Sequence, residues 1–167
     1  MNLQIRPFSN NDMEDIVRLS LLAWEPVFRS FQQVLGAEIY TRLHPDWKKE
    51  QKETVEQICK DEEKTTVWVA DVDAIVVGFI AYTLYAEDKT NAEEKTGEVQ
   101  LLAVHPAYQN QGIGTELNNF ALQKMKEGGM RLAVVGTGGD PGHAPARRSY
   151  EKAGYTALPI VRYIQAL

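Results

Sequence analysis

Two glycines, Gly112 and Gly114, stand where a strand-like segment turns into a helix-like one. The residues before them, 101–104, form an apolar run that His105-Pro106 ends, and the residues after them repeat apolar side chains at helical spacing. Glycines in a first helical turn leave its free N–H groups uncovered, and these donors bind phosphate together with the positive end of the helix dipole. The segment therefore predicts an anion site.

Two common phosphate-binding motifs do not fit this segment. A P-loop requires a lysine directly after its last glycine, and neither glycine is followed by lysine. A dinucleotide-binding fingerprint requires a third small residue at position 117, which is Leu117. What remains is the pattern Gln109-x-x-Gly112-x-Gly114 after Leu-Ala-Val-His-Pro.

This pattern resembles the pyrophosphate loop of the GNAT superfamily, the acetyl-CoA-dependent N-acetyltransferases, in which Arg/Gln-x-x-Gly-x-Gly/Ala follows a strand of this kind. A second segment, Ala-Arg-Arg-Ser-Tyr-Glu-Lys-Ala-Gly-Tyr at 146–155, resembles the family's second motif, a helix with a tyrosine ahead of Glu-Lys-x-Gly-aromatic. The resemblance extends over the whole chain and is most specific from Glu98 to Tyr155. It implies acetyl-CoA as the co-substrate.

The resemblance also implies where the cofactor is held. Backbone N–H groups of the loop would bind the pyrophosphate, and Leu102, Ala103 and Val104 would hydrogen-bond the pantetheine arm like an added strand. The loop residues are Gln109, Asn110, Gln111, Gly112, Ile113, Gly114 and Thr115. Many relatives carry Arg or Lys in this loop, which is neutral here, so Arg147 and Arg148 are candidates for the missing positive charge. A solvated helix face is the alternative for both arginines.

Acyl transfer from a thioester to an amine requires a neutral amine, a donor for the oxyanion and a proton for the leaving thiolate. Glu98 is the first candidate base, acting directly or through a water, because it lies four residues before Leu102 and so on the same face of a strand. Some GNAT members use a glutamate at this spacing; the alternative is a solvent-exposed residue at a strand start. Tyr150 is the candidate acid by the resemblance, with a core tyrosine as its alternative. A backbone N–H near 102–104 would hold the oxyanion.

His143 lies seven residues before Tyr150, where relatives often have an asparagine. A helix N-terminus favours the neutral imidazole, which would hydrogen-bond pantetheine or relay a proton from the amine. A capping or turn residue is the alternative. The three histidines show no metal-ligand spacing and Cys59 is the one cysteine, so we expect no metal.

We expect the acceptor pocket to come from the N-terminal helices and the hairpin. Aromatic rings there would surround a cationic amine by cation–π contact, and the acidic net charge favours such a ligand. The same residues would serve equally well as core. The candidates are Trp24, Phe28, Phe31, Tyr40 and Tyr82.

The elements that must position these residues follow from periodicity and from turn residues. Strands are expected at 3–7, 65–71, 75–85, 97–104, 130–136 and 160–166, the second and third forming a hairpin. Helices are expected at 11–25, from Pro26 to Gly36, at 38–43, 47–62, 111–127 and 144–153. A charged, exposed loop is expected at 87–95. The strand-helix-strand-helix order from 98 to 153 requires that part of the sheet is parallel.

Composition narrows the class of protein. The chain has 167 residues and a net charge of −5, the wrong sign for a dedicated nucleic-acid-binding face. The start, MNLQIRPF, lacks the hydrophobic core of a signal peptide, and the longest apolar stretch, 74–86, is short for a membrane helix. A single cysteine fits a reducing compartment. We therefore expect a cytoplasmic protein without a nucleic-acid or membrane partner.

The expected fold is a single α/β, GNAT-like domain over residues 1–167, with a central mixed twisted sheet splayed between the fourth and fifth strands and helices on both faces. The expected function is transfer of an acetyl group from acetyl-CoA to a primary amine of a small molecule or peptide, by direct attack in a ternary complex. The alternative is a non-catalytic acyl-CoA-binding regulatory module. A homodimer is compatible with either.

Overall fold

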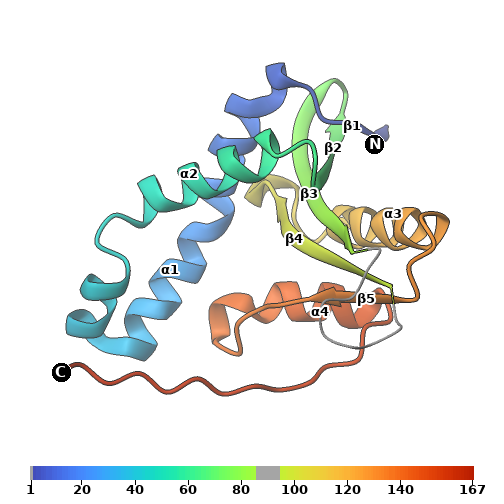
Figure 1. Ribbon diagram of the computed structural model, residues 1–167. Helices are drawn as coiled ribbons and strands as arrows, with labels where there is room; N and C mark the ends of the chain where they lie inside the picture. The colour runs from blue at the N-terminus through green and yellow to red at the C-terminus, as the bar shows by residue number, and fades with distance from the viewer. Residues whose placement is uncertain (1, 86–94) are drawn as a thin grey trace.

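The computed structural model describes residues 2–85 and 95–167, with a five-stranded mixed sheet at its centre (Figure 1). The strand order is β1-β2-β3-β4-β5; the first four strands are antiparallel neighbours, and β5 is parallel to β4. The strands are β1 (Leu3–Pro7), β2 (Thr65–Val72), β3 (Ile75–Tyr85), β4 (Thr96–Val104) and β5 (Leu132–Val135). The α-helices are α1 (Met13–Leu43), α2 (Trp47–Lys60), α3 (Ile113–Glu127) and α4 (Ala144–Lys152). The predicted mixed α/β fold is confirmed.

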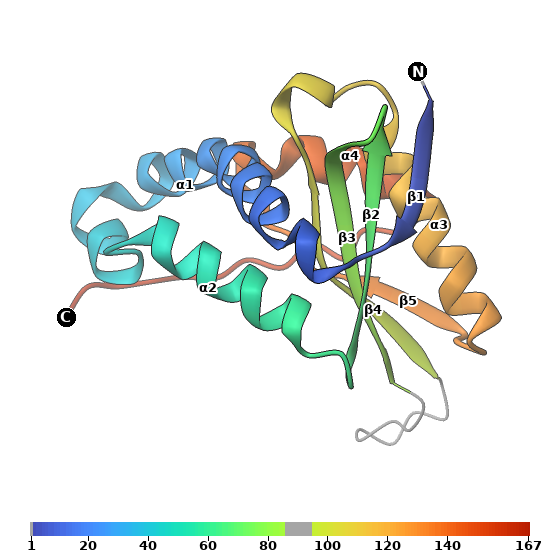
Figure 2. The same ribbon diagram turned by 90° about the horizontal axis from the view of Figure 1, so that it is seen from above.

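Helices cover both faces of the sheet, and each face has its own hydrophobic core (Figure 2). On one face, Ile16 and Leu19 of α1 and Val55 of α2 are buried in the same cluster as Phe79. On the other, α3 buries a stripe at helical spacing. That stripe is Ile113, Leu117, Ala121 and Met125. Alternation along β3 supplies both cores, because successive side chains of a strand point to opposite faces.

The sheet opens between β4 and β5. The two strands pair only from Thr96–Val99 of β4 to Leu132–Val135 of β5, whereas β4 continues to Val104. The last part of β4 therefore has no partner on its β5 side in the described chain. This confirms the predicted splay, and it lies at the carboxyl ends of the parallel strands, where α/β proteins bind ligands.

Pro26 does not separate two helices, which corrects the sequence prediction. Helix α1 runs through Pro26, and the chain changes direction at Gly36, where φ is +75° and ψ is 163°. A proline removes one helical hydrogen bond, but Leu19 before it and Val27 and Phe28 after it are buried. Burial of the side chains on both sides of the proline thus outweighs the loss of that hydrogen bond.

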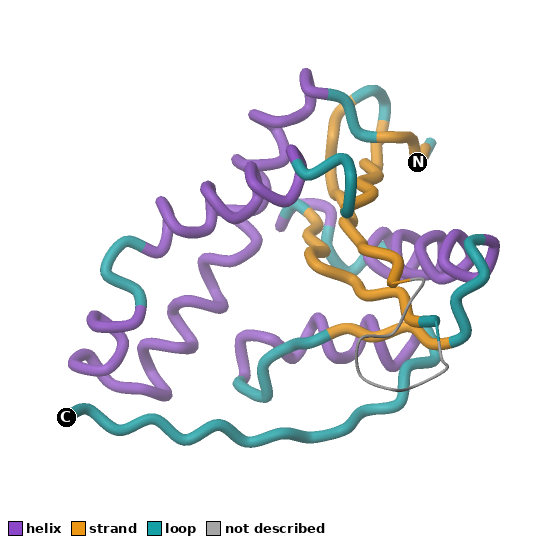
Figure 3. The backbone as a smooth tube through the Cα atoms, viewed as in Figure 1, coloured by secondary structure: helices purple, strands orange, loops and turns teal. Residues whose placement is uncertain are grey.

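The C-terminal residues do not form the strand predicted at 160–166. Residues 156–167 have no assigned secondary structure, and they extend past α4 toward the far end of α1 (Figures 1 and 3). Their β-branched and aromatic side chains favour an extended backbone, but a strand also needs an edge to pair with. In this structure the segment is extended, but it does not pair with another strand of the described chain.

Two further expectations concern the surface. The charged loop expected at 87–95 lies, except for Lys95, outside the described residues. Among the helices that the structure describes, none combines the length and the apolar character that crossing a membrane requires.

Candidate active site

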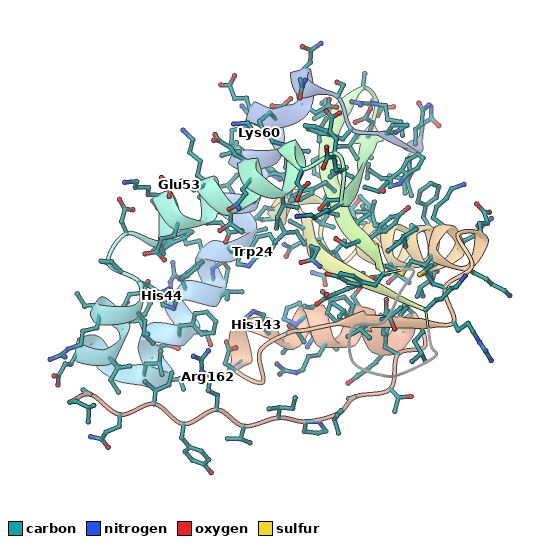
Figure 4. The ribbon with its side chains drawn as sticks, in the orientation of Figure 1. Trp24, His44, Glu53, Lys60, His143 and Arg162 are labelled. Atoms are coloured by element: carbon teal, nitrogen blue, oxygen red, sulfur yellow. The ribbon has the colours of Figure 1, made fainter. Side chains whose placement is uncertain are left out.

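A cleft of about 470 Å³ opens where β4 and β5 separate. Its walls are the second half of β4, the loop before α3, helix α4 and the middle of α1. Figure 4 shows two of the lining residues, Trp24 on α1 and His143 at the start of α4. The cleft therefore joins the predicted cofactor loop to the helices expected to bind the acceptor.

The loop before α3 presents its backbone to the cleft. Gly112 caps α3 in the left-handed region with φ +87°, and Asn110 has φ +61°. The side-chain amide of Gln109 donates to the Val104 carbonyl at 2.9 Å, and that of Gln111 donates to the Ala107 carbonyl at 3.2 Å. Both glutamine side chains thus brace the loop, and the first-turn N–H groups have no intrahelical partner.

Most of the predicted cofactor residues line the cleft. They are Leu102, Ala103, Val104, Gln109, Asn110, Gly112, Ile113, Gly114 and Thr115. Gln111 and Arg147 are not among the lining residues. The Arg147 guanidinium instead donates to the carbonyls of Gly138 and Asp140, at 2.6 and 2.8 Å, while Arg148 and Lys152 supply positive charge to the cleft.

His143 is held by a network that the sequence analysis missed. Its Nδ1 lies 2.5 Å from a carboxylate oxygen of Asp140, and the Ser30 hydroxyl donates to the other oxygen at 2.6 Å. The N–H of Gly142 lies 3.0 Å from both the Ser30 hydroxyl and Asp140. With Nδ1 directed at the carboxylate, Nε2 is the ring nitrogen left to accept a proton.

The chain geometry explains how this network is built. Asp140 caps the turn Pro141–His143 and lies three residues before His143, a spacing visible in the sequence. Ser30 comes from α1, 110 residues from Asp140, so no sequence pattern connects them. A Cβ on Gly142 would lie 2.7 Å from the Cβ of Ser30, which shows why a glycine is needed at this approach.

Asp140 is ionised in this setting. Burial raises the pKa of its carboxyl group, but hydrogen bonds from Ser30 and His143, together with the charge of His143, outweigh burial and hold the pKa below its ordinary value. A carboxylate that remains ionised orients the imidazole and stabilises the imidazolium formed when His143 takes up a proton.

Glu98 does not share a face with Leu102, contrary to the expectation from strict alternation. The pairing of β3 with β4 shifts register here, so that Ala81 faces Leu101 and Tyr82 faces Val99. Gln100 is therefore the extra residue of a β-bulge, which reverses the alternation beyond it. Val99 and Leu102 accordingly pack in the same core although they are three residues apart.

Glu98 itself is half-buried but is not among the residues that line the cleft. It interacts instead with Tyr85. Burial, the charge of Glu98 and a hydrogen bond to Glu98 raise the pKa of the Tyr85 hydroxyl. Gln100, the extra residue of the bulge, does line the cleft.

Tyr150 lines the cleft from α4, and its ring contacts that of Tyr155 edge to face at 5.8 Å. Burial, with a smaller contribution from Tyr155, raises the pKa of Tyr150 to about 12. The hydroxyl is therefore protonated at neutral pH, and it is a hydrogen-bond donor more readily than an acid.

The predicted acceptor residues separate into three groups. Trp24 lines the cleft. Phe28, Phe31 and Tyr40 join a ring cluster with His44 and Trp47, in which Phe28 stacks on Trp47 at 4.5 Å and Phe31 lies 5.4 Å from His143. Tyr82 lies in the α3 core, where its hydroxyl accepts a hydrogen bond from Trp68 at 3.3 Å. The structure thus brings Trp24 and His143 together and places Tyr82 elsewhere.

Residues 30–155 match the sequence pattern of the acetyltransferase (GNAT) family, and the chain belongs to this family. Among curated proteins, the chain is 32% identical over 92 residues to a mycothiol acetyltransferase from Sanguibacter keddieii. The match takes in 55% of this chain but only 28% of that protein's length. The predicted recognition of the family is confirmed.

Solved structures of other proteins share the fold at low sequence identity. A PaiA N-acetyltransferase from Thermoplasma acidophilum in complex with coenzyme A has a TM-score of 0.68 at 20% identity, over 93% of this chain and 91% of that one. An aminoglycoside 6'-N-acetyltransferase from Acinetobacter haemolyticus has a TM-score of 0.67 at 16% identity, over 100% and 99%. A transcriptional regulator from Bacillus halodurans has a TM-score of 0.67 at 22% identity, over 99% and 100%.

Proposed function

We propose that this chain transfers an acetyl group from acetyl-CoA to a primary amine of a small molecule or peptide, by direct attack within a ternary complex. One observation carries the proposal. A single cleft joins a glycine-opened helix start, a stretch of β4 without a partner on its β5 side, and a histidine oriented by an ionised carboxylate. Family membership and the acetyltransferases among the solved structures support the same reaction class.

The cofactor would lie along β4 and across the start of α3. Backbone groups on the β5 side of Leu102–Val104 would pair with the pantetheine amides, and the N–H groups at Gly112–Thr115 would bind the pyrophosphate. Arg148 and Lys152, which line the same cleft, would supply the positive charge that the neutral loop lacks.

His143 would serve as the base and Asp140 as the residue that positions it. The acceptor arrives as an ammonium, because its ordinary pKa is about 10.4, and it must lose one proton before its nitrogen can attack. Nε2 would accept that proton, and Asp140 would stabilise the resulting imidazolium. The neutral amine would then form the C–N bond, and its nitrogen would lose a second proton to solvent as the intermediate collapses to the amide. Glu98 stays a second candidate base, and its place outside the cleft lining makes it the weaker one.

Tyr150 would assist departure of the thiolate as the C–S bond breaks. Its pKa of about 12 lies well above the ~8.5 of a thiol, so complete proton transfer would be uphill by about 5 kcal/mol. A hydrogen bond from the Tyr150 hydroxyl to the departing sulfur is therefore the role that fits, and the thiolate takes its proton from solvent after release.

The assay that tests this proposal measures thiol release from acetyl-CoA in the presence of a panel of primary amines. An acetyltransferase releases coenzyme A only when an acceptor is present, and mass spectrometry of the acceptor shows the added acetyl group. If the protein retains acetyl-CoA and releases no thiol with any amine, it is the non-catalytic acyl-CoA-binding module instead.

A substitution at Gly114 tests the cofactor site separately. A Cβ at this position would make ordinary contacts, 3.5 Å from the Ser149 hydroxyl and 3.7 Å from Val104, so Gly114→Ala is the matched control. The two additional methyl groups of Gly114→Val would enter the cleft where the pyrophosphate approaches. We expect calorimetry to show at least a tenfold (about 1.4 kcal/mol) loss of acetyl-CoA affinity for the valine variant alone. Equal affinity of both folded variants would contradict this site.

A further inference from the structure

Helix α3 buries an asparagine beside its apolar stripe. Asn118 follows the buried Leu117 and is itself fully buried. Its side-chain Nδ2 donates to the Ser149 hydroxyl of α4 at 3.2 Å, but its Oδ1 has no hydrogen-bond partner in the described chain. A buried polar atom without a partner costs folding stability, and a leucine has the same branched shape without that cost. Stability of the fold alone therefore does not account for an asparagine at this position.

The partner of Asn118 lies at the cleft. Ser149 is half-buried and is one of the residues that line it. A serine within a helix can donate its proton to a carbonyl of the preceding turn, but in the described part of the chain the Ser149 hydroxyl makes only the bond from Asn118. Because the hydroxyl oxygen accepts that bond, its proton remains available to another acceptor.

Ser149 lies beside the first turn of α3. Gly114 and Asn118 are four residues apart and so share one face of this helix. A Cβ on Gly114 would lie 3.5 Å from the Ser149 hydroxyl oxygen, which places that oxygen next to the N–H groups that open the helix. Arg148 and Lys152, on the same helix as Ser149, also line the cleft. A hydroxyl donor, free N–H groups and cations together suit an anion.

We propose that Ser149 binds the pyrophosphate of the cofactor and that Asn118 positions its hydroxyl, an inference that rests on the proposed use of acetyl-CoA. Ser149 donates its proton to a phosphate oxygen, while the Asn118 amide holds the hydroxyl oxygen. The amide thus costs stability in the unliganded chain and contributes to affinity in the complex. Ser149 is the binding residue, and Asn118 is a positioning residue that acts through it.

Calorimetric titration with acetyl-CoA tests the contact. We expect Ser149→Ala to weaken binding by about tenfold (about 1.4 kcal/mol), because a hydrogen bond to a charged group is lost. Thr54→Ala is the matched control, since Thr54 also carries a hydroxyl on a helix but is exposed on α2 and bonds to the Glu50 carbonyl. Equal affinity of Ser149→Ala and the parent chain would overturn this inference alone. If the parent chain binds no acetyl-CoA, the proposed function fails with it.

Asn118→Leu tests the positioning role by two readouts that move in opposite directions. The melting temperature of the unliganded protein should stay equal or rise, because the oxygen without a partner is removed. The affinity for acetyl-CoA should fall by about threefold (about 0.6 kcal/mol). A purely structural asparagine predicts the reverse, a lower melting temperature with unchanged affinity. Asn119→Leu, at the neighbouring exposed position, is the matched control and should leave the affinity unchanged.

The double variant shows whether Asn118 acts through Ser149, even if leucine is poorly accommodated in the core. If it does, Asn118→Leu combined with Ser149→Ala should bind acetyl-CoA as Ser149→Ala alone does. Losses of affinity that add independently would contradict the positioning role of Asn118.

A crystal structure of the complex with coenzyme A identifies the group that Ser149 contacts. We expect the Ser149 oxygen to lie within hydrogen-bond distance of a pyrophosphate oxygen. A hydrogen bond from Ser149 to the pantetheine arm instead, or no contact with the cofactor, would show that the assignment to the pyrophosphate is wrong.

Discussion

Two clusters in this molecule each hold a buried carboxylate by hydrogen bonds, but the partners of the two carboxylates differ. In the first, Asp12 accepts two hydrogen bonds from Arg6 at 2.8 Å, and the Arg6 guanidinium also donates to Asp71 at 2.6 Å. The hydrogen bond from Arg6 holds the pKa of Asp12 below its ordinary value, although burial acts against it. This cluster joins β1, the turn before α1 and β2.

In the second cluster Asp140 also keeps a lowered pKa, but its partners are Ser30 and His143. An arginine is permanently charged and has no nitrogen that can accept a proton, so the Arg6 cluster offers no group for proton transfer. A histidine has two ring nitrogens, and only Nδ1 of His143 is used, which leaves the other available at a cleft. A hydrogen-bonded carboxylate is therefore no sign of function by itself; the nature of its partner is what distinguishes the two clusters.

The largest effect is expected from the second cluster. Replacing His143 by alanine removes the proposed base, and turnover at neutral pH should fall by about 10²–10⁴. The loss should shrink as the pH rises, because the acceptor then supplies its own neutral amine. Steady-state rates over a pH series check this. His105 is not among the residues that line the cleft, so His105→Ala is the control for loss of a histidine elsewhere.

Asp140→Asn should reproduce part of this loss, because an amide cannot stabilise an imidazolium as a carboxylate does. A structural role alone would lower the melting temperature and leave the shape of the pH–rate profile unchanged. An unaltered profile in a folded Asp140→Asn variant would remove Asp140 from the mechanism and make the two clusters equivalent.

The first cluster should show the reverse behaviour. Asp12→Asn breaks the charged hydrogen bonds to Arg6 and should lower the free energy of unfolding by about 2 kcal/mol at neutral pH. Because the folded-state pKa of Asp12 lies below the ordinary 3.8, this stability is complete above that value and is lost as pH falls through the lowered pKa. Acetyl transfer should be unchanged.

Chemical denaturation at neutral and acid pH measures this effect. The gap between the parent chain and Asp12→Asn should close toward acid pH, whereas Asp15→Asn, in an exposed pair with Arg18, should show almost no gap at any pH. A rate loss in Asp12→Asn without a loss of stability would contradict the division between the clusters.

The sequence predicts β1 and the elements near the cofactor loop better than the course of α1 or the C-terminal segment. Glycines with positive φ, strand alternation and helical stripes are local signals, and they place Gly112, β4 and α3 correctly. Pro26 misleads because tertiary packing on both sides of it outweighs the local preference. The 156–167 segment misleads because strand propensity does not say whether the chain brings a segment beside an edge strand.

The site is predictable to the extent that its members are close in sequence. His143 and Tyr150 lie on one helix and its cap, and both line the cleft. Ser30 reaches Asp140 across 110 residues, and no pattern in one sequence reveals such a contact. The bulge at Gln100 is equally hidden, since it follows from the register of β3 against β4 and not from residue type.

The smallest effect is expected from the residue that this bulge displaces. Glu98 would be the base if β4 alternated strictly, and Glu98→Gln would then slow turnover most at low pH, where neutral amine is scarce. Because Glu98 contacts Tyr85 outside the cleft lining, we expect the rate to change by less than about threefold (~0.6 kcal/mol) at every pH. Glu116→Gln, on the exposed start of α3, is the matched charge control. If instead Glu98→Gln produces the acid-side loss and His143→Ala does not, the proton acceptor is Glu98, and the Asp140 cluster holds the chain in place just as the Arg6 cluster does.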